Sequence, residues 1–329
     1  MDSFLFAVNA VAPIILTVAI GYLLKKAGFM NADFAKAANK LVFRLFLPAM
    51  LFLNVYRIAS IGGINMNYIM YCLVALLVIF LLSIPAVILV ARKREYRGVL
   101  LQGAFRSNYA LIGIPLAQSL FGNDGVIVAT LLSAAVIPLF NILAVISLSI
   151  FRVERGKKPS ITHILSDIVR NPLIQSIALG VLVLGVRAFF TANDISFRLT
   201  DITPLFTVLG YLSDLATPLA LLVLGAQFEF SAVKALRREI IFGTLMRTVI
   251  VPLLGIGTAY AFFSSQFSGA HFAAFAAMFA TPVAVSSVPM AQEMDGDVAL
   301  AGQLVVWTTL ASAFSVFLVA FLLRLAGIF

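Results

Sequence analysis

Charged residues are scarce in this 329-residue chain. Asp, Glu, Lys and Arg together make up 11% of it, which is less than half of the ~25% found in an ordinary soluble domain. Hydrophobic residues make up 62%, so lipid is the natural solvent for most of the chain. The composition therefore argues against a soluble globular domain and predicts an all-α polytopic membrane protein.

Cysteine and histidine are nearly missing. The single cysteine, Cys72, lies inside an apolar run, which excludes a disulfide framework within the chain. The two histidines fall near predicted membrane interfaces, and no cluster of His, Cys and carboxylates has metal-ligand spacing. The chain also lacks a nucleophile elbow, a phosphate-binding loop and a dinucleotide fingerprint. We therefore expect no metal, no cofactor and no enzymatic activity, and no direct use of ATP.

Apolar runs of about 20 residues, the length that spans a bilayer as a helix, recur along the chain. Ten spans are predicted, at 4–24, 39–57, 67–91, 98–121, 125–150, 171–191, 205–228, 239–262, 271–292 and 298–323. The longest polar interval, 152–170, divides the chain nearly in half. The expected organisation is a first five-helix repeat over 1–151, a cytoplasmic linker over 152–170 and a second five-helix repeat over 171–329.

Lys and Arg are concentrated in alternate loops between the predicted spans. Of the 23 Lys and Arg residues, 17 follow odd-numbered spans, in the stretches 25–44, 92–97, 152–170 and 234–238. The positive-inside rule places these stretches in the cytoplasm and both termini on the non-cytoplasmic side of the cell membrane. The net charge of +9 thus reflects a multi-pass topology, and no nucleic-acid partner is expected.

Two segments interrupt the apolar pattern in matching ways. Residues 106–122 read RSNYALIGIPLAQSLFG, and residues 280–296 read ATPVAVSSVPMAQEMDG. The Pro-x-Ala-Gln of 115–118 recurs at 289–292, an offset of 174 residues, and Pro48 pairs more weakly with Pro218. Because each half holds an odd number of spans, the second half must enter the membrane from the opposite side. Inverted repeats of this kind are typical of secondary transporters whose site lies near the midplane.

Proline and glycine inside a span free backbone groups that only protein or a water-filled cavity can satisfy. Gly113-Ile114-Pro115 is expected to break the fourth span, and Thr281-Pro282 with Pro289 to break the ninth; ordinary proline kinks are the alternative. Freed amides and half-helix N-termini favour anions. The candidate substrate-binding residues at the two breaks are Arg106, Asn108, Gly113, Pro115, Gln118, Thr281, Pro282, Ser286, Ser287, Pro289 and Gln292.

Charges within spans are functional candidates by default. Arg106 lies about 12 Å into the fourth span at 1.5 Å per residue, where its planar fork suits a substrate carboxylate; snorkelling or an internal salt bridge is the alternative. Arg247 has a similar depth, with a structural ion pair as its alternative. Asp214 and Glu293 are, with Arg247, candidates for coupling to H⁺ or Na⁺. A solvated helix end is the alternative for Asp214, and a position in a loop is favoured for Glu293.

Several stretches resemble the auxin efflux carrier family of bacterial permeases, which is related to the plant PIN-type auxin carriers. LVFRLFLPAMLFLNV (41–55) is similar to the family's second span and RSNYALIGIPLA (106–117) to its fourth. ATPLALLVLGAQF (216–228) is similar to the seventh span and LMRTVIVPLL (245–254) to the eighth. The resemblance runs nearly from end to end.

The resemblance implies a ten-helix, five-plus-five inverted fold in which broken spans four and nine cross. It implies a scaffold of spans one, two, six and seven and a moving unit of spans three to five and eight to ten. Asn108 matches the family's crossing-point asparagine, with Pro115 and Pro282 in the broken regions. The Asn-Pro-Asn crossing motif of the plant proteins is absent from both halves, and so is their long central loop. A homodimer formed through spans two and seven is also an expectation from the family.

The function expected from these features is secondary transport of small organic anions by elevator-type alternating access. Bacterial relatives suggest malate, malonate or similar carboxylates, and auxin-like acids are less favoured. An anion channel and a cation-coupled symporter of the bile-acid symporter type are the alternatives. A channel requires a continuous polar stripe along several helices, whereas the polar residues here gather at two midplane points. A receptor or enzyme requires a large ligand-binding loop or a catalytic constellation, and the sequence has neither.

Overall fold

The computed structural model describes residues 2–57, 66–152 and 161–329. Within these ranges every regular element is a helix, and the one β-type pairing is an isolated antiparallel bridge between Ser107 and Val283. Residues 153–160 of the predicted cytoplasmic linker fall outside the described ranges. The linker's remaining part forms the short helix α7 (Ile161–Arg170).

The helices follow the chain in two series. Before the linker they are α1 (Asp2–Lys26), α2 (Ala32–Leu41), η1 (Val42–Phe46), α3 (Leu47–Tyr56), α4 (Met66–Val90), α5 (Arg94–Phe105), η2 (Tyr109–Gly113) and α6 (Ile114–Phe151). After α7 they are α8 (Pro172–Ala192), η3 (Leu199–Asp201), α9 (Thr203–Gln227), α10 (Phe230–Ala235), α11 (Arg237–Leu245), η4 (Met246–Ile250), η5 (Leu253–Gly257), α12 (Thr258–Phe263), α13 (Gly269–Phe279), α14 (Ser287–Glu293) and α15 (Val298–Leu325).

Several of these helices have the length and composition of membrane spans. In the described part of the chain seven qualify, at 32–56, 66–90, 109–151, 172–192, 203–227, 237–263 and 298–325. The 43-residue helix at 109–151 changes direction at Gly122, whose φ of 58° is a conformation that glycine adopts at little cost. That turn lies where the sequence predicts the boundary between spans four and five. The all-helical, multi-span class expected from composition is therefore confirmed.

The interruption of the fourth predicted span differs in place from the expectation. The chain leaves the helical conformation at Arg106–Asn108, between α5 and η2, and not at Gly113-Ile114-Pro115. Pro115 instead lies in the first turn of α6, directly after the π-type turn η2. A widened π turn has room for a residue that contributes no N–H to the i−4 pattern. The proline is therefore compatible with a continuous helix here.

The ninth predicted span is interrupted at residues 280–286, between α13 and α14, which includes the predicted Thr281-Pro282. Pro289, also expected to break the span, lies inside α14. It occupies the first turn of that helix, where backbone N–H groups have no intrahelical acceptor and a missing donor costs little. Pro289 therefore fits a helix start.

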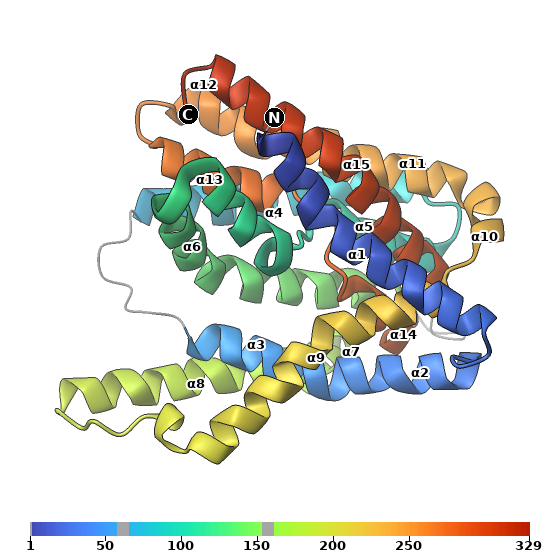
Figure 1. Ribbon diagram of the computed structural model, residues 1–329, viewed down its shortest axis with the longest axis horizontal. Coiled ribbons are helices and arrows are strands. Elements are labelled where there is room, and N and C mark those ends of the chain that lie inside the picture. The colour runs from blue at the N-terminus through green and yellow to red at the C-terminus, as the bar shows by residue number, and fades with distance from the viewer. Residues whose placement is uncertain (1, 58–65, 153–160) are drawn as a thin grey trace.

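Two groups of helices share the molecule (Figure 1). The helices α8 and α9 both pack against α3 and form with it the lower arm of the view, while α1 and α2 pack along α9. Phe52, Leu53 and Tyr56 of α3 have their own apolar cluster with side chains of α8 and α9. The helices α4, α5, α6, α11, α13 and α15 pack together in the second group. We call α1, α2, η1, α3, α8 and α9 the arm, and α4, α5, α6, α11, α13, α14 and α15 the lobe.

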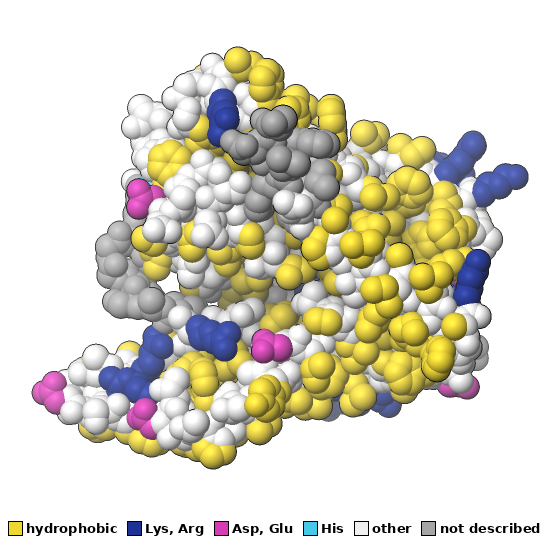
Figure 2. Space-filling view, in the orientation of Figure 1, with side chains coloured by type: hydrophobic (Ala, Val, Ile, Leu, Met, Phe, Trp, Pro, Cys, Tyr) yellow, Lys and Arg dark blue, Asp and Glu magenta, His cyan; other side chains and the backbone are white. Residues whose placement is uncertain are grey.

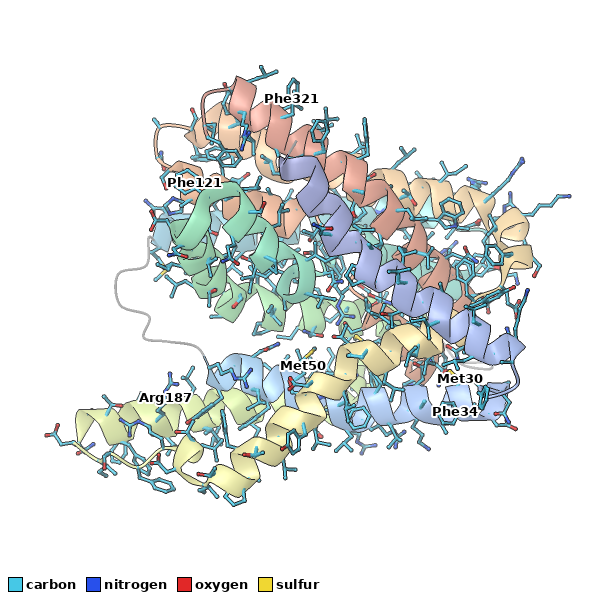
Figure 3. The ribbon with its side chains drawn as sticks, in the orientation of Figure 1. Met30, Phe34, Met50, Phe121, Arg187 and Phe321 are labelled. Carbon is cyan, nitrogen blue, oxygen red and sulfur yellow. The ribbon has the colours of Figure 1, made fainter. Side chains whose placement is uncertain are left out.

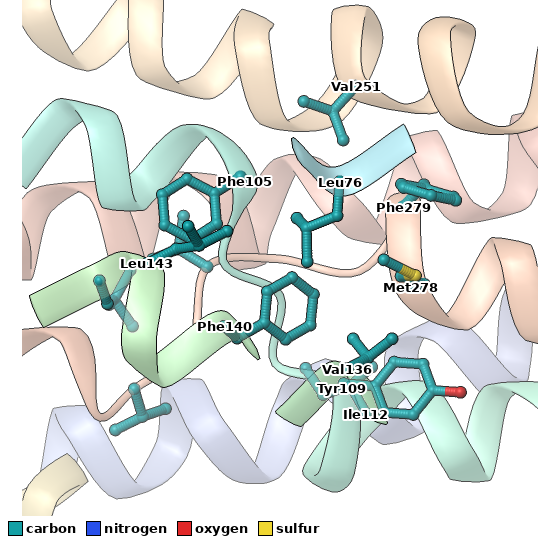
Figure 4. Packing of buried hydrophobic residues seen from close by; sticks show 14 of the residues in the cluster. Leu76, Phe105, Tyr109, Ile112, Val136, Phe140, Leu143, Val251, Met278 and Phe279 are labelled. Atoms are coloured by element: carbon teal, nitrogen blue, oxygen red, sulfur yellow. The ribbon is translucent and has the colours of Figure 1, made fainter. Parts of the chain in front are cut away.

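The lobe has the larger core. Phe105 at the end of α5 stacks on Phe140 of α6 with ring centroids 6.4 Å apart, and both are buried (Figure 4). Met278 and Phe279, at the end of α13, are buried in the same cluster. The last residues of α5 and α13 are thus fixed by apolar packing on either side of the two interruptions.

Helices α1 and α9 approach each other at glycines, and this contact supplies a stability prediction. A Cβ built on Gly225 of α9 meets the Val18 carbonyl oxygen at 2.0 Å, whereas one built on Gly210 of the same helix meets nothing within 4 Å. We expect Gly225→Ala to lower the thermal unfolding midpoint in detergent, with a cost of about 1–3 kcal/mol or more, because the two backbones must separate. Gly210→Ala is the matched control, and equal midpoints for the two variants would contradict the close contact.

Candidate functional site

The two interrupted segments lie side by side and bond to each other. The Asn108 N–H donates to the Pro282 carbonyl at 2.8 Å, and the Ala284 N–H donates to the Arg106 carbonyl at 3.4 Å. With the Ser107–Val283 bridge, these bonds make a short antiparallel pairing between residues that are separated by more than half of the chain. The non-helical backbone at both breaks is therefore partly satisfied by the other break, as it must be inside a membrane.

Hydroxyl groups complete this pairing. Ser107 Oγ and Thr281 Oγ1 lie 2.7 Å apart, and both residues are buried. Thr308 Oγ1 of α15 accepts a hydrogen bond from the Val283 N–H at 3.1 Å. We call this arrangement of 106–108, 280–286 and their hydroxyl partners the crossing.

Arg106 is the charged member of the crossing that faces the arm. Its side chain is 3% exposed, and its Nη2 donates to Asn141 Oδ1 at 2.7 Å and to Ser286 Oγ at 2.8 Å. Its Nη1 contacts Met290 Sδ. Among the described residues no carboxylate forms an ion pair with it. A buried guanidinium held by neutral groups alone leaves a positive charge that an anion can balance.

Asn108 supplies an amide donor beside this charge. It is 8% exposed, and its Nδ2 is buried with no hydrogen-bond partner among the described residues. Its carbonyl accepts from the Ile112 N–H at 3.0 Å and from the Gly113 N–H at 3.3 Å, so a helical segment begins directly after it. The N–H groups of the first turn of that segment, and the positive end of its dipole, point back toward the crossing. An unsatisfied amide and a helix N-terminus thus meet at one place.

Two small cavities lie between the crossing and the arm. One, of about 60 Å³, is lined by Arg106, Asn108, Asn141 and Ser286 from the lobe and by Met50 and Asn54 from α3, among others. The other, of about 50 Å³, shares Asn108, Ser286 and Met50 and is also lined by Thr217 of α9. Both cavities are small in this conformation, although each is large enough to hold water.

A hollow separates the arm from the lobe on one side of the molecule (Figure 2). Met50, which lines both cavities, lies where α3 faces the lobe across this separation (Figure 3). On the opposite side, α2 and α14 are in contact. The arm and the lobe thus approach each other at one end and are set apart at the other, with the two cavities in between.

Comparison with known proteins identifies the family. The family model described as membrane transport protein matches residues 6–320 of the chain. The chain belongs to this family. The resemblance to the auxin efflux carriers is thereby confirmed. An uncharacterized transporter of Methanothermobacter thermautotrophicus is 26% identical over 318 residues, which cover 95% of this chain and 97% of the relative. An uncharacterized transporter of Methanocaldococcus jannaschii is 27% identical over 251 residues, which cover 74% of this chain and 76% of the relative.

In this membrane transport protein, three of the predicted site residues after Asn108 line neither cavity. Gly113 is buried in η2, where an added Cβ meets the Ala277 carbonyl oxygen of α13 at 2.8 Å. Its role is the close approach of these two helices. Pro115 and Gln118 lie on the exposed face of α6. The break that the sequence placed at Gly113–Pro115 is in fact at 106–108, and Gln118 is correspondingly far from it along the helix.

The candidates from the second broken segment lie in two places, at the crossing and in α14. Thr281, Pro282 and Ser286 belong to the crossing, as described above. Ser287 is buried beside them, and its Oγ has no hydrogen-bond partner among the described residues. Pro289 is buried inside α14.

Gln292 lies at the far end of α14 and bonds to the arm. Its Oε1 accepts from Asn39 Nδ2 at 2.8 Å and from Gln227 Nε2 at 3.1 Å, and its Nε2 donates to the Lys36 carbonyl at 3.2 Å. Asn39 Nδ2 also donates to Gln227 Oε1 at 2.9 Å. This amide cluster joins α14 to α2 and α9 where the arm and the lobe meet.

The three candidates for ion coupling lie in different surroundings. Asp214 is exposed on α9. Glu293, next to Gln292, forms an ion pair with Arg44 of η1, with Nε and Oε2 3.3 Å apart. Arg247 has no carboxylate in ion-pair contact among the described residues, and its side chain donates to backbone carbonyls at the crossing. The expected alternative for Arg247, a structural ion pair, is thus not what the described residues show.

Asn141 is a site residue that sequence reasoning missed. It lies in the middle of α6, is 3% exposed, and holds the guanidinium of Arg106. Its Nδ2 donates to the Ile137 carbonyl at 2.8 Å, and this bond orients its Oδ1 toward Arg106. An amide inside the apolar run 125–150 was the available signal. Asn54 and Thr217, which line the cavities from the arm, are polar residues inside spans as well.

Proposed function

We propose that this membrane transport protein is a secondary transporter of small organic anions, with its substrate site at the crossing. The observation that carries the proposal is that two buried groups line one cavity: a guanidinium held by neutral groups and an amide N–H, neither of which has an anionic partner among the described residues. Both groups line cavities between the arm and the lobe. A bound anion supplies the missing charge to Arg106 and the missing acceptor to Asn108.

Carboxylates suit this site best. A guanidinium fork and an amide donor match the two oxygens of a carboxylate, and the hydroxyl of Ser286 adds a third group beside them. The remaining lining is largely apolar, with Leu47, Met50 and Phe140 among its members, and suits a short carbon chain. Because the cavities are small in this conformation, we favour malate- or malonate-sized acids over auxin-like acids. Binding then requires the arm and the lobe to separate slightly.

The proposed mechanism is elevator-type alternating access on a ten-span, five-plus-five inverted fold. The arm, which includes α1 and α2, corresponds to the scaffold of spans one, two, six and seven. The lobe corresponds to the moving unit of spans three to five and eight to ten. Support comes from the position of the cavities, whose anion-binding groups lie on the lobe while α3 and α9 supply the opposite wall. A moving lobe then carries the substrate past a fixed arm.

The direction in which the site faces follows from the proposed topology. With the basic loops in the cytoplasm and both termini outside, the amide cluster at Gln292 and the Arg44–Glu293 pair lie at the cytoplasmic end. The hollow of Figure 2 then opens to the non-cytoplasmic side. Contacts at one end and separation at the other favour a transporter over an anion channel, which needs one continuous path.

Uptake into proteoliposomes tests the proposal. Radiolabelled malate, malonate and indole-3-acetate are offered to the purified parent with imposed proton or sodium gradients. We expect saturable uptake of a small carboxylate, and we expect Asn108→Ala to lower its efficiency roughly ten- to hundredfold, since a hydrogen bond to a charged group contributes about 1.5–3 kcal/mol. Asn193→Ala, an exposed asparagine at the end of α8, is the matched control. Unsaturable, gradient-independent flux would instead establish a channel.

A further inference from the structure

Arg247 binds the backbone at both breaks with a single side chain. Its Nε donates to the Thr281 carbonyl at 2.7 Å, and its Nη2 donates to the Met278 carbonyl at 2.8 Å. Its Nη1 donates to the Phe105 carbonyl at 3.1 Å and reaches the Ala104 carbonyl at 3.4 Å. Arg247 is fully buried. One guanidinium thus contacts the last carbonyls of α5 and of α13, although the two helices come from opposite halves of the chain.

These carbonyls are the groups that a broken helix leaves without donors. The last turn of a helix has no N–H groups for its final carbonyls, and the helix dipole makes that end negative. In transporters built from broken helices, such ends and the unwound carbonyls next to them coordinate the coupling Na⁺ or H⁺. At this crossing the same kinds of carbonyl are already bonded to Arg247.

We propose that Arg247 is a fixed internal cation that takes the place of a coupling sodium ion at the crossing, so that anion transport does not depend on Na⁺. Its charge stays with the lobe throughout the cycle. The inference rests on the proposed function where it is tested by uptake. Where it is tested by cation binding, it does not depend on that function. Arg247 does not line the cavities, so it acts as a positioning residue.

The charges near Arg247 fit this assignment. Glu239, the buried acid two turns earlier on α11, has Arg92 as its ion-pair partner, at 3.9 Å. No acid among the described residues pairs with Arg247 or with Arg106. The two arginines differ in their neutral surroundings. Arg247 has helix-end carbonyls, whose dipoles balance its charge, whereas Arg106 has an amide and a hydroxyl beside a cavity.

The test removes the Arg247 guanidinium by substitution and adds a soluble cation that can take its place. Parent, Arg247→Ala, Arg247→Lys and the control Arg324→Ala, an exposed arginine at the end of α15, are purified in choline buffer. Thermal midpoints are measured with added Na⁺, K⁺ or low millimolar methylguanidinium, and uptake of the transported acid is measured in the same media.

The expected results separate an internal cation from a simple structural contact. The parent and Arg324→Ala keep the same midpoint and uptake in all media. Arg247→Ala loses about tenfold in uptake, because the carbonyls it leaves are unsatisfied, and methylguanidinium or Na⁺ raises both its midpoint and its uptake. Arg247→Lys keeps the charge and retains Na⁺-independent uptake.

Two results overturn the proposal. One is a saturable rise of the parent's midpoint or uptake with Na⁺; the other is an Arg247→Ala protein whose midpoint responds to no cation. If Arg247→Ala cannot be purified folded, the parent and Arg247→Lys decide the question by their Na⁺ dependence. If the parent takes up no acid, the midpoint measurements still judge Arg247, and the proposed substrate class fails separately.

Discussion

Replacing Arg106 by glutamine is expected to abolish saturable uptake of organic anions while leaving the fold as stable as before. Removal of one member of a buried, hydrogen-bonded charge pair costs about 2–5 kcal/mol of binding, so uptake efficiency falls about thirtyfold or more. The guanidinium is held by Asn141 and Ser286 and by no acid among the described residues. Its buried charge is therefore a cost to the empty protein, and the neutral variant is relieved of it.

The prediction is sharp because uptake is expected to be lost while the thermal midpoint is retained. Uptake is measured in proteoliposomes and the thermal midpoint in detergent, with Arg324→Gln as a control that removes an equal charge from an exposed position. If Arg106→Gln lowers the midpoint and the uptake together, Arg106 holds the crossing together and does not contact substrate. If uptake is unchanged, the site lies elsewhere.

The sequence locates the ninth-span break at Thr281-Pro282 and places the fourth-span break one to two turns too late. Both segments could be noticed because proline, glycine and amides are rare in apolar runs. The error was to assign the fourth-span break to the helix-breaking residues Gly113 and Pro115. Their environment decided otherwise, since a π-type turn accommodates the proline and Gly113 packs against α13. The non-helical residues are Arg106 to Asn108, whose own helix propensity is ordinary. Their conformation is set by bonds to residues 282–284, far along the chain.

Long-range pairing also explains what the sequence missed. Arg106 and Arg247 have the same apparent depth in a span, and both are buried. Only the packing of α5, α6, α11 and α13 shows that one faces a cavity and the other faces helix ends. Asn141 was overlooked because a single amide in an apolar run has no local sign of its partner. Asp214 and Glu293, noticed because they are acids, differ in that one is exposed and the other paired.

The repeated Pro-x-Ala-Gln motif acquires a meaning from the asymmetry of its two copies. Gln292 bonds to Asn39 and Gln227 of the arm, whereas Gln118, its counterpart, is exposed on α6. In an inverted repeat whose two ends close in turn, one copy contacts the scaffold while the other is released. On the proposed mechanism, the structure is therefore the state in which the Gln292 end is closed.

Cross-linking the closed end is expected to stop transport. In a Cys72→Ala background, which removes the single native cysteine, Arg44→Cys and Glu293→Cys place thiols where an ion pair of 3.3 Å now joins arm and lobe. A short, reducible bifunctional thiol reagent then ties α14 of the lobe to η1 of the arm. Because alternating access requires these elements to separate, uptake falls to the level of empty liposomes, and a reductant restores it.

The chain contains a matched control for this experiment. Arg152 and Asp295 form an ion pair of 2.8 Å between the end of α6 and the loop after α14, and both belong to the lobe. The same reagent on Arg152→Cys with Asp295→Cys therefore links two parts of one moving body, and uptake stays at the level of the unlinked variant. Equal inhibition by both links would contradict a rigid lobe, and no inhibition by either would contradict movement of α14 against η1. Inhibition by the Arg44–Glu293 link alone identifies the contact between arm and lobe as the one that must open, because the two links differ only in whether they cross it.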